Sequence, residues 1–106
     1  MKKIILALSV LFGTHAMAYQ VATGKVNSVS VNPNSVVIEW STTITNTDNC
    51  THPAATTTLV LPLTNDTKAQ FSALLSANVS GKNARVLYDG CLAGLPQIIR
   101  VDLVAN

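Results

Sequence analysis

The sequence predicts a small, mainly β domain with one helix and one disulfide bond. Segments rich in β-branched residues recur between turn signals, and one segment alone has apolar residues at helical spacing. The chain has 106 residues and two cysteines, Cys50 and Cys91. With 48% hydrophobic residues at this length, we expect a single folded domain and not a disordered chain.

The first 18 residues have the pattern of a bacterial secretory signal peptide. Lys2 and Lys3 precede an apolar run over residues 4–12, and the small-residue pattern at 16–18 provides a cleavage site. The run is shorter than the ~20 residues that cross a membrane as a helix. We therefore expect an exported protein, periplasmic or secreted, whose single domain spans residues 19–106 and does not insert into a membrane.

Without its first 18 residues the chain is electrically neutral, with five basic and five acidic side chains. Nucleic-acid binding draws much of its affinity from Lys and Arg, so we expect no nucleic-acid partner. Anionic membranes are poor partners for the same reason. Ser, Thr and Asn account for 27 of these 88 residues. That composition suits solvated strand surfaces, and it also suits contact with a neutral, hydroxyl-rich ligand such as a glycan.

The first part of the domain predicts three strands. Residues 19–31 have spaced valines, which a bulge near Asn27-Ser28 would bring to one face. A turn signal at 32–35 leads to residues 36–44, which are rich in β-branched residues and predict a hairpin with the preceding segment. Residues 46–55 are polar and predict a loop. Residues 56–63 predict a third strand that ends near Pro62.

The second part predicts a helix and two more strands. Phe71, Leu74, Leu75 and Val79 form one helical stripe, and a capping-box pattern from Thr67 to Gln70 with a stop at Gly81 predicts a helix over residues 67–79. Residues 84–88 predict a short strand that ends in the turn Asp89-Gly90, before a loop over residues 92–96. The last strand, 97–104, alternates and is expected to be half-buried, with Ile99, Val101 and Leu103 on its apolar face and Arg100 and Asp102 on the other.

The two cysteines match the exported compartment. One pairing is available, so we expect a Cys50–Cys91 disulfide. It closes a loop of about 42 residues, for which the chain-entropy model gives roughly 4 kcal/mol of stabilisation. His52 beside Cys50 offers too few partners for a zinc site, and the spacing of the cysteines is not that of a redox-active pair. We expect no metal and no cofactor.

The predicted order is β-β-β-α-β-β. This is the strand order of the OB-fold, a five-stranded Greek-key barrel, with the helix between the third and fourth strands. A short helix with one apolar stripe suits the plug at one end of such a barrel. A small β-sandwich and a two-layer α+β domain have compatible element orders and remain the alternatives.

The second half of the chain also carries a resemblance. Residues 68–82 (KAQFSALLSANVSGK), 86–91 (VLYDGC) and 98–104 (IIRVDLV) resemble a family of small exported bacterial proteins. That family is similar in layout to the OB-fold B subunits of AB-type toxins, of the pertussis and subtilase cytotoxin type. The match covers about 40 of the 88 residues, and the first half matches in its leader, its hairpin and the position of Cys50. The resemblance implies the OB-fold, export and the Cys50–Cys91 bridge, and more weakly sugar binding and assembly into a pentameric homo-oligomer.

The residue types do not favour an enzyme. A Ser or Cys nucleophile needs a base, and the one His after the leader is His52, which we expect to be an exposed loop residue. Glycoside hydrolysis needs two carboxylates in one cleft. Three of the acidic residues have structural explanations, with Asp66 at a helix start, Asp89 in a turn and Asp102 beside Arg100, and we expect Glu39 on the solvent face of its strand. No catalytic residues are predicted.

The leading functional hypothesis is therefore a non-catalytic binding module that recognises a glycan or a protein at the cell exterior. Its candidate contact residues are Trp40, Tyr88 and Tyr19, because aromatic side chains supply contact area at low entropic cost. Core packing is the favoured competing explanation for Trp40, whereas for Tyr88 core packing and ligand contact are evenly balanced. The alternative function is a structural or inhibitory periplasmic protein that acts through a protein interface.

Overall fold

The computed structural model describes residues 19–104; the predicted signal peptide lies outside the described residues. The described part is mainly β, with one α-helix and a short 3₁₀ turn. Its elements are β1 (Gln20–Gly24), β2 (Val26–Val31), β3 (Ser35–Trp40), β4 (Thr58–Pro62), η1 (Asn65–Thr67), α2 (Lys68–Ser80), β5 (Ala84–Leu92) and β6 (Leu95–Leu103). None of the helical segments described is long and apolar enough to span a membrane.

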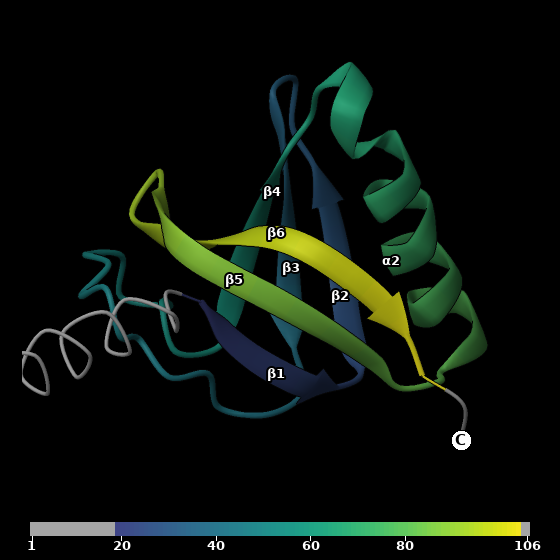
Figure 1. Cartoon of the computed structure of the whole chain (residues 1–106), viewed down its shortest axis with the longest axis horizontal. Helices are drawn as coiled ribbons and strands as arrows, with labels where there is room; N and C mark the ends of the chain where they lie inside the picture. The colour runs from purple at the N-terminus through teal and green to yellow at the C-terminus, as the bar shows by residue number, and fades with distance from the viewer. Residues whose placement is uncertain (1–18, 105–106) are drawn as a thin grey trace, which may run out of the picture.

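The strands form one six-stranded sheet in the order β1-β5-β6-β4-β3-β2. All neighbours are antiparallel except β4 and β6, which run parallel with Val60 opposite Gln97. The sheet is strongly curved, so that β1, β5 and β6 lie in front of β4, β3 and β2 in Figure 1, and α2 packs beside β2 and β6. The sheet therefore differs from the predicted closed barrel of five strands. It has six strands, and the two strands at its edges, β1 and β2, are not paired with each other.

The sixth strand arises from a break in the first predicted strand at Lys25. β1 ends at Gly24 and β2 begins at Val26, and these consecutive segments occupy opposite edges of the sheet. The break is held by Ser41, which follows β3. Its hydroxyl accepts the Lys25 N–H at 2.8 Å, and its own N–H donates to the Lys25 carbonyl at 3.0 Å. The N–H and the carbonyl of Lys25 are thus both hydrogen-bonded to Ser41 at the bend.

Gly24 lies at this bend in close approach to the side chains of Ser41 and Trp40. A Cβ at position 24 would lie 2.8 Å from the Ser41 Oγ and 3.0 Å from the Trp40 Nε1. The Trp40 side chain is 3% exposed, and its indole N–H has no acceptor among the described residues. The missing side chain at Gly24 is therefore what lets the chain pass over the buried indole.

The hairpin of β2 and β3 confirms the sequence prediction, including a bulge between Val26 and Ser28. On the free edge of β2 the side chain of Asn78 in α2 donates to the Val26 carbonyl at 3.0 Å and to the Asn27 carbonyl at 3.4 Å. The helix thus covers the start of an edge strand with hydrogen bonds as well as with apolar contacts.

The helix α2 matches the predicted range to within one residue, but its start and its buried face differ. The capping box lies in η1, where the Thr64 hydroxyl accepts from Asp66 N–H at 3.2 Å and the Thr67 hydroxyl accepts from Thr64 N–H at 2.9 Å. Gly81 ends the helix with a φ of 69°, as predicted. The buried residues are Leu74 and Ala77, with Phe71 partly buried.

The predicted stripe is therefore only half correct. Val79 is 86% exposed and Leu75 is 38% exposed, because the face that meets the sheet runs through Leu74, Ala77 and Asn78. Small and polar side chains on that face allow the helix to approach β2, whereas the two apolar residues point to solvent.

The C-terminal hairpin also departs from the prediction. Asp89-Gly90 is not a turn but a bulge inside β5, with Gly90 at a φ of 71°, and the hairpin turns at Ala93-Gly94, where both φ angles are positive. A second register shift places Leu87 opposite Arg100 and Tyr88 opposite Ile98, so Ile99 is the extra residue. Because of this bulge, Ile98 is buried at 2% exposure, whereas Ile99, predicted to be buried, is 44% exposed.

The core lies between the two halves of the curved sheet and is closed at the side by α2. Its fully buried members come from both halves and from the helix: Val36, Ile38, Leu59, Leu61, Leu74, Val86 and Ile98. Ile44, which was predicted to lie in a strand, sits in the loop after β3 but is still 1% exposed. That loop is thereby anchored in the core.

We predict that Gly24→Ala destabilises the protein by about 1–3 kcal/mol, because the added methyl group overpacks the contact with Trp40 and Ser41. The neighbouring exposed Thr23→Ala is the control and is expected to change stability by less than about 0.5 kcal/mol. Denaturant unfolding of the two variants measures the difference. Equal stability of both variants would show that the bend tolerates a side chain.

Candidate functional site

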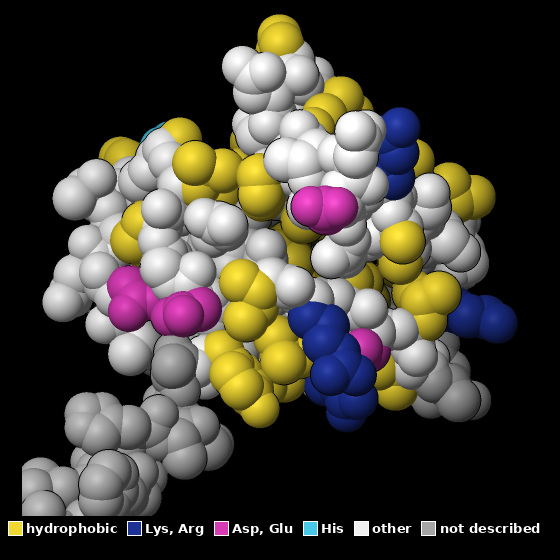
Figure 2. All heavy atoms as spheres, turned by 45° about the horizontal axis from the view of Figure 1, so that its top comes forward, with side chains coloured by type: hydrophobic (Ala, Val, Ile, Leu, Met, Phe, Trp, Pro, Cys, Tyr) yellow, Lys and Arg dark blue, Asp and Glu magenta, His cyan; other side chains and the backbone are white. Residues whose placement is uncertain are grey.

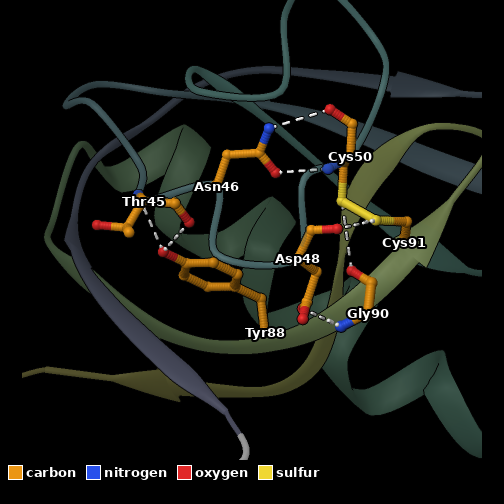
Figure 3. The surroundings of a disulfide bond; sticks show 7 residues. All are labelled: Thr45, Asn46, Asp48, Cys50, Tyr88, Gly90 and Cys91. Atoms are coloured by element: carbon orange, nitrogen blue, oxygen red, sulfur yellow. Dashed lines mark hydrogen bonds between the residues drawn. A yellow bond between two sulfur atoms is a disulfide. The ribbon is translucent and has the colours of Figure 1, made fainter.

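The predicted contact residue Tyr88 lies in the core and holds the loop between β3 and β4. Its side chain is 4% exposed, and its hydroxyl accepts the Thr45 N–H at 3.1 Å and donates to the Thr45 carbonyl at 3.0 Å (Figure 3). Burial raises the pKa of this phenol above its ordinary value, because the charged form would lose its hydration. The side chain is therefore placed for packing and for fixing the loop.

The disulfide joins the same loop to β5, as the sequence predicts. Cys50 and Cys91 are bonded, and the Asn46 side chain shapes the loop by accepting the Cys50 N–H at 2.8 Å and donating to the Cys50 carbonyl at 3.0 Å (Figure 3). Asp48 adds a third connection, since its carboxylate accepts the Gly90 N–H at 2.7 Å. The loop is thus tied to β5 at Tyr88, Gly90 and Cys91.

The remaining predicted contact residues are not brought together. Trp40 is buried in the core beneath Gly24, whereas Tyr19, just before β1, is 40% exposed. Core packing, the competing explanation for Trp40, is therefore where the structure places this side chain. Of the three predicted aromatics, Tyr19 alone presents substantial surface.

The structure also places the histidine and the acidic residue that the sequence analysis weighed for catalysis. His52 is exposed, and its Nδ1 accepts the Ala54 N–H at 3.0 Å within the loop. Glu39 is exposed on β3, as expected from its strand position. Between residues 19 and 104, no three His, Cys, Asp or Glu side chains gather closely enough to hold a metal ion.

A three-residue ion network lies on the outer face of β5 and β6. Asp102 accepts from Arg100 Nε at 2.9 Å and from Arg85 at 3.1 Å. The hydrogen bond from Arg100, and then that from Arg85, hold the pKa of Asp102 below its ordinary value. Two guanidinium groups share one carboxylate, so the three-residue network carries one net positive charge.

A shallow groove lies at the N-terminal end of α2 and offers a concave surface to a small ligand. Its volume is about 720 Å³, within the range of small-molecule sites. Its lining combines an aromatic and an aliphatic side chain with hydroxyl, amide and ammonium groups: Leu63, Thr64, Asn65, Lys68, Phe71 and Ser72. In Figure 1 this end of the helix lies near the β2–β3 hairpin, and the Leu63 N–H donates to the Asn34 carbonyl at 2.9 Å.

Phe71 gives the groove a fixed apolar wall. The ring packs against the core while remaining only partly buried. The side chains of Asn65, Lys68 and Ser72 are exposed and make no hydrogen bond within residues 19–104. The sequence pattern assigns Phe71 to the apolar stripe of the helix, and the structure leaves this ring packed against the core but only partly buried.

A second candidate surface is the outer face of the sheet formed by β1, β5 and β6. Figure 2 shows hydrophobic side chains between a group of acidic side chains on one side and a group of Lys and Arg side chains on the other. Val21 is 51% and Ile99 is 44% exposed on these strands. Apolar side chains grouped in this way on a strand face are a feature of protein interfaces.

We predict that Tyr88→Phe destabilises the protein by about 1–3 kcal/mol, because the Thr45 N–H and carbonyl lose their buried partner. Tyr19→Phe removes a hydroxyl from an exposed tyrosine and is the matched control, with an expected change below about 0.5 kcal/mol.

We also predict a pH dependence that the Tyr88→Phe variant lacks. Since the folded pKa of Tyr88 is raised, its contribution to stability is complete below the ordinary value of 10.0 and is lost as the pH rises from there through the folded pKa. Denaturant unfolding between pH 8 and pH 11, referred to the Tyr88→Phe variant, measures this contribution. An identical alkaline loss in both proteins would contradict the assignment.

Comparisons with protein-family models, with curated proteins and with solved structures found no match. The function therefore has to follow from the chemistry of the chain's own residues. Those residues provide two surfaces of different character, a polar groove with an aromatic wall and an apolar strand face bordered by charges.

Proposed function

We propose that this chain is an exported, non-catalytic binding module that recognises a glycan at the cell exterior through the groove at the start of α2. The observation that carries the proposal is the lining of that groove, in which the partly exposed Phe71 ring lies among Asn65, Lys68 and Ser72. The export assignment is supported by the leader pattern together with the Cys50–Cys91 bond.

The groove chemistry suits a neutral, hydroxyl-rich ligand. An aromatic face packs against the apolar C–H surface of a sugar ring, and its rigidity keeps the entropic cost of contact low. Amide, hydroxyl and ammonium groups supply donors and acceptors that fix the orientation of the ligand. The neutrality of the domain is consistent with such a ligand, because no basic excess attracts polyanions.

We further propose that the fold is an OB-fold in which the first strand is interrupted. β1 and β2 would together be the first strand, because Lys25 alone separates them, and β3, β4, β5 and β6 would be the second to fifth. The helix then lies between the third and fourth strands, and the parallel neighbours are the third and fifth. OB-folds bind oligosaccharides and oligonucleotides, which favours a binding role over catalysis.

The alternative is a structural or inhibitory periplasmic protein that acts through a protein interface. It is favoured by the exposed apolar residues on the outer face of β1, β5 and β6. A glycan array distinguishes the two functions, because a protein-interface function requires no sugar binding. A neighbouring gene for a secreted catalytic subunit would favour a toxin-type binding module over a periplasmic role.

We predict that the exported protein binds a defined set of sugars on a glycan array and that the Asn65→Ala/Ser72→Ala double variant weakens this binding at least about tenfold, because two polar contacts are removed. Phe71→Leu is expected to weaken it similarly while keeping the apolar contact with the core.

The matched control is the Asn83→Ala/Ser76→Ala double variant. It changes the same residue types in a separate hollow of about 300 Å³ beside the end of α2, and it should leave binding unchanged. Binding that is absent from the array, or that responds equally to both double variants, would contradict a sugar site in the groove.

A further inference from the structure

The outer face of β1, β5 and β6 presents two rows of side chains that run across the three strands. In the first row Leu87 of β5 lies between Val21 of β1 and Arg100 of β6. The second row, in the same strand order, is Thr23, Arg85 and Asp102. Residues paired across antiparallel strands share a face, and neighbouring strands lie about 5 Å apart. The two rows are about 7 Å apart along the strands, because two residues separate them.

At the β6 side of this face, one carboxylate holds two guanidinium groups. Asp102 Oδ1 accepts from Arg100 Nε at 2.9 Å, and its Oδ2 accepts from Arg85 Nη2 at 3.1 Å. The side chain of Asp102 is 18% exposed, whereas those of Arg85 and Arg100 are 49% and 66% exposed. Within residues 19–104 the two Nη groups of Arg100 make no hydrogen bond. The guanidinium groups are thus held in place with N–H donors left for a second anion.

Aliphatic side chains border these two cations. Leu87 is half-buried directly beside Arg100, and Val21 continues the row with 51% exposure. Ile99 precedes Arg100 in the bulge of β6 and is 44% exposed. Figure 2 shows hydrophobic side chains next to a group of Lys and Arg side chains. The face therefore combines a net positive charge with exposed aliphatic area.

We propose that this face binds a segment of a partner protein that carries an Asp or Glu carboxylate close to an aliphatic side chain. The partner carboxylate accepts from Arg85 and Arg100 and balances the charge that Asp102 leaves. The aliphatic side chain packs on Leu87 and Val21. These lie about 5–10 Å from Arg100 across the strands, which corresponds to two or three residues of an extended segment.

Charge complementarity selects an acidic partner, because two guanidinium groups here share one carboxylate. Since Asp102 already orders both arginines, little side-chain entropy is lost when the second carboxylate binds. The aliphatic neighbours favour a protein segment over a free anion such as phosphate, which gains nothing from apolar contact. The proposal is independent of the groove at the start of α2, whose lining shares no residue with this face.

The test selects peptides from a random 12-residue library displayed on phage, with the exported protein immobilised in low salt. The enriched peptides are synthesised and their affinities measured. We expect them to carry Asp or Glu two or three residues from Val, Ile or Leu, and to bind more weakly as salt is added. The Arg85→Gln/Arg100→Gln double variant is expected to weaken binding at least about tenfold.

A double-mutant cycle locates the interaction. Changing the peptide's Asp or Glu to Asn or Gln is expected to cost as much as the change of the two arginines. The amide peptide should then bind wild type and the double variant equally, because the same ion pair is already lost. Val21→Ser leaves the ion network intact and is expected to weaken binding several-fold through the apolar contact, which keeps the test valid if the double variant fails to fold.

The matched control is Lys68→Gln/Lys82→Gln, which removes the same charge from two exposed cations at the ends of α2. It should leave peptide binding unchanged. Enriched peptides without an acidic residue, no enrichment at all, or an equal loss in both double variants would each overturn the proposal. Inorganic phosphate that displaces the peptides at equal concentration would indicate a free-anion site and would also overturn it.

Discussion

The approach of the chain to Trp40 at Gly24 is the constraint on which the rest of the structure depends. Because no side chain lies between the backbone and the indole, β1 and β2 can diverge at Lys25 and take opposite edges of one sheet. After the divergence, β1 pairs with β5 at one edge of the sheet and β2 pairs with β3 at the other edge. The bend therefore lets one continuous segment of chain border both edges of the curved sheet that encloses the core.

Much of the fold could be predicted from local patterns. The β2–β3 hairpin with its bulge, the helix with its stop at Gly81 and the Cys50–Cys91 bond depend on residues close in sequence or on simple pairing. The break at Lys25 could not be predicted, because it depends on residues distant in sequence. These are Trp40 at the end of β3 and Ser41, which follows it. The bulges in the last hairpin were missed for a similar reason. Asp89-Gly90 has the composition of a turn, and only pairing with β6 makes it a bulge.

The candidate site was harder to predict than the fold. Aromatic residue type indicates contact area, but it does not say whether the core or a ligand uses that area. Tyr88 and Trp40 are used by the core, the first to hold Thr45 and the second to support the bend. Phe71 belongs to the predicted helix stripe and does pack against the core, but part of its ring also lines the groove. The net charge of the domain follows from the sequence, whereas the sharing of Asp102 by Arg85 and Arg100 depends on the pairing of β5 with β6.

The contact of Asn78 with β2 bears on how the molecule avoids aggregation. An open sheet has two edges whose unpaired N–H and carbonyl groups can recruit further strands. At the start of β2 the carbonyls of Val26 and Asn27 are already bonded to the amide of Asn78, and the edge formed by β1 is only five residues long. Edge-to-edge growth into a continuous sheet is therefore disfavoured at the start of β2 and along the short edge of β1.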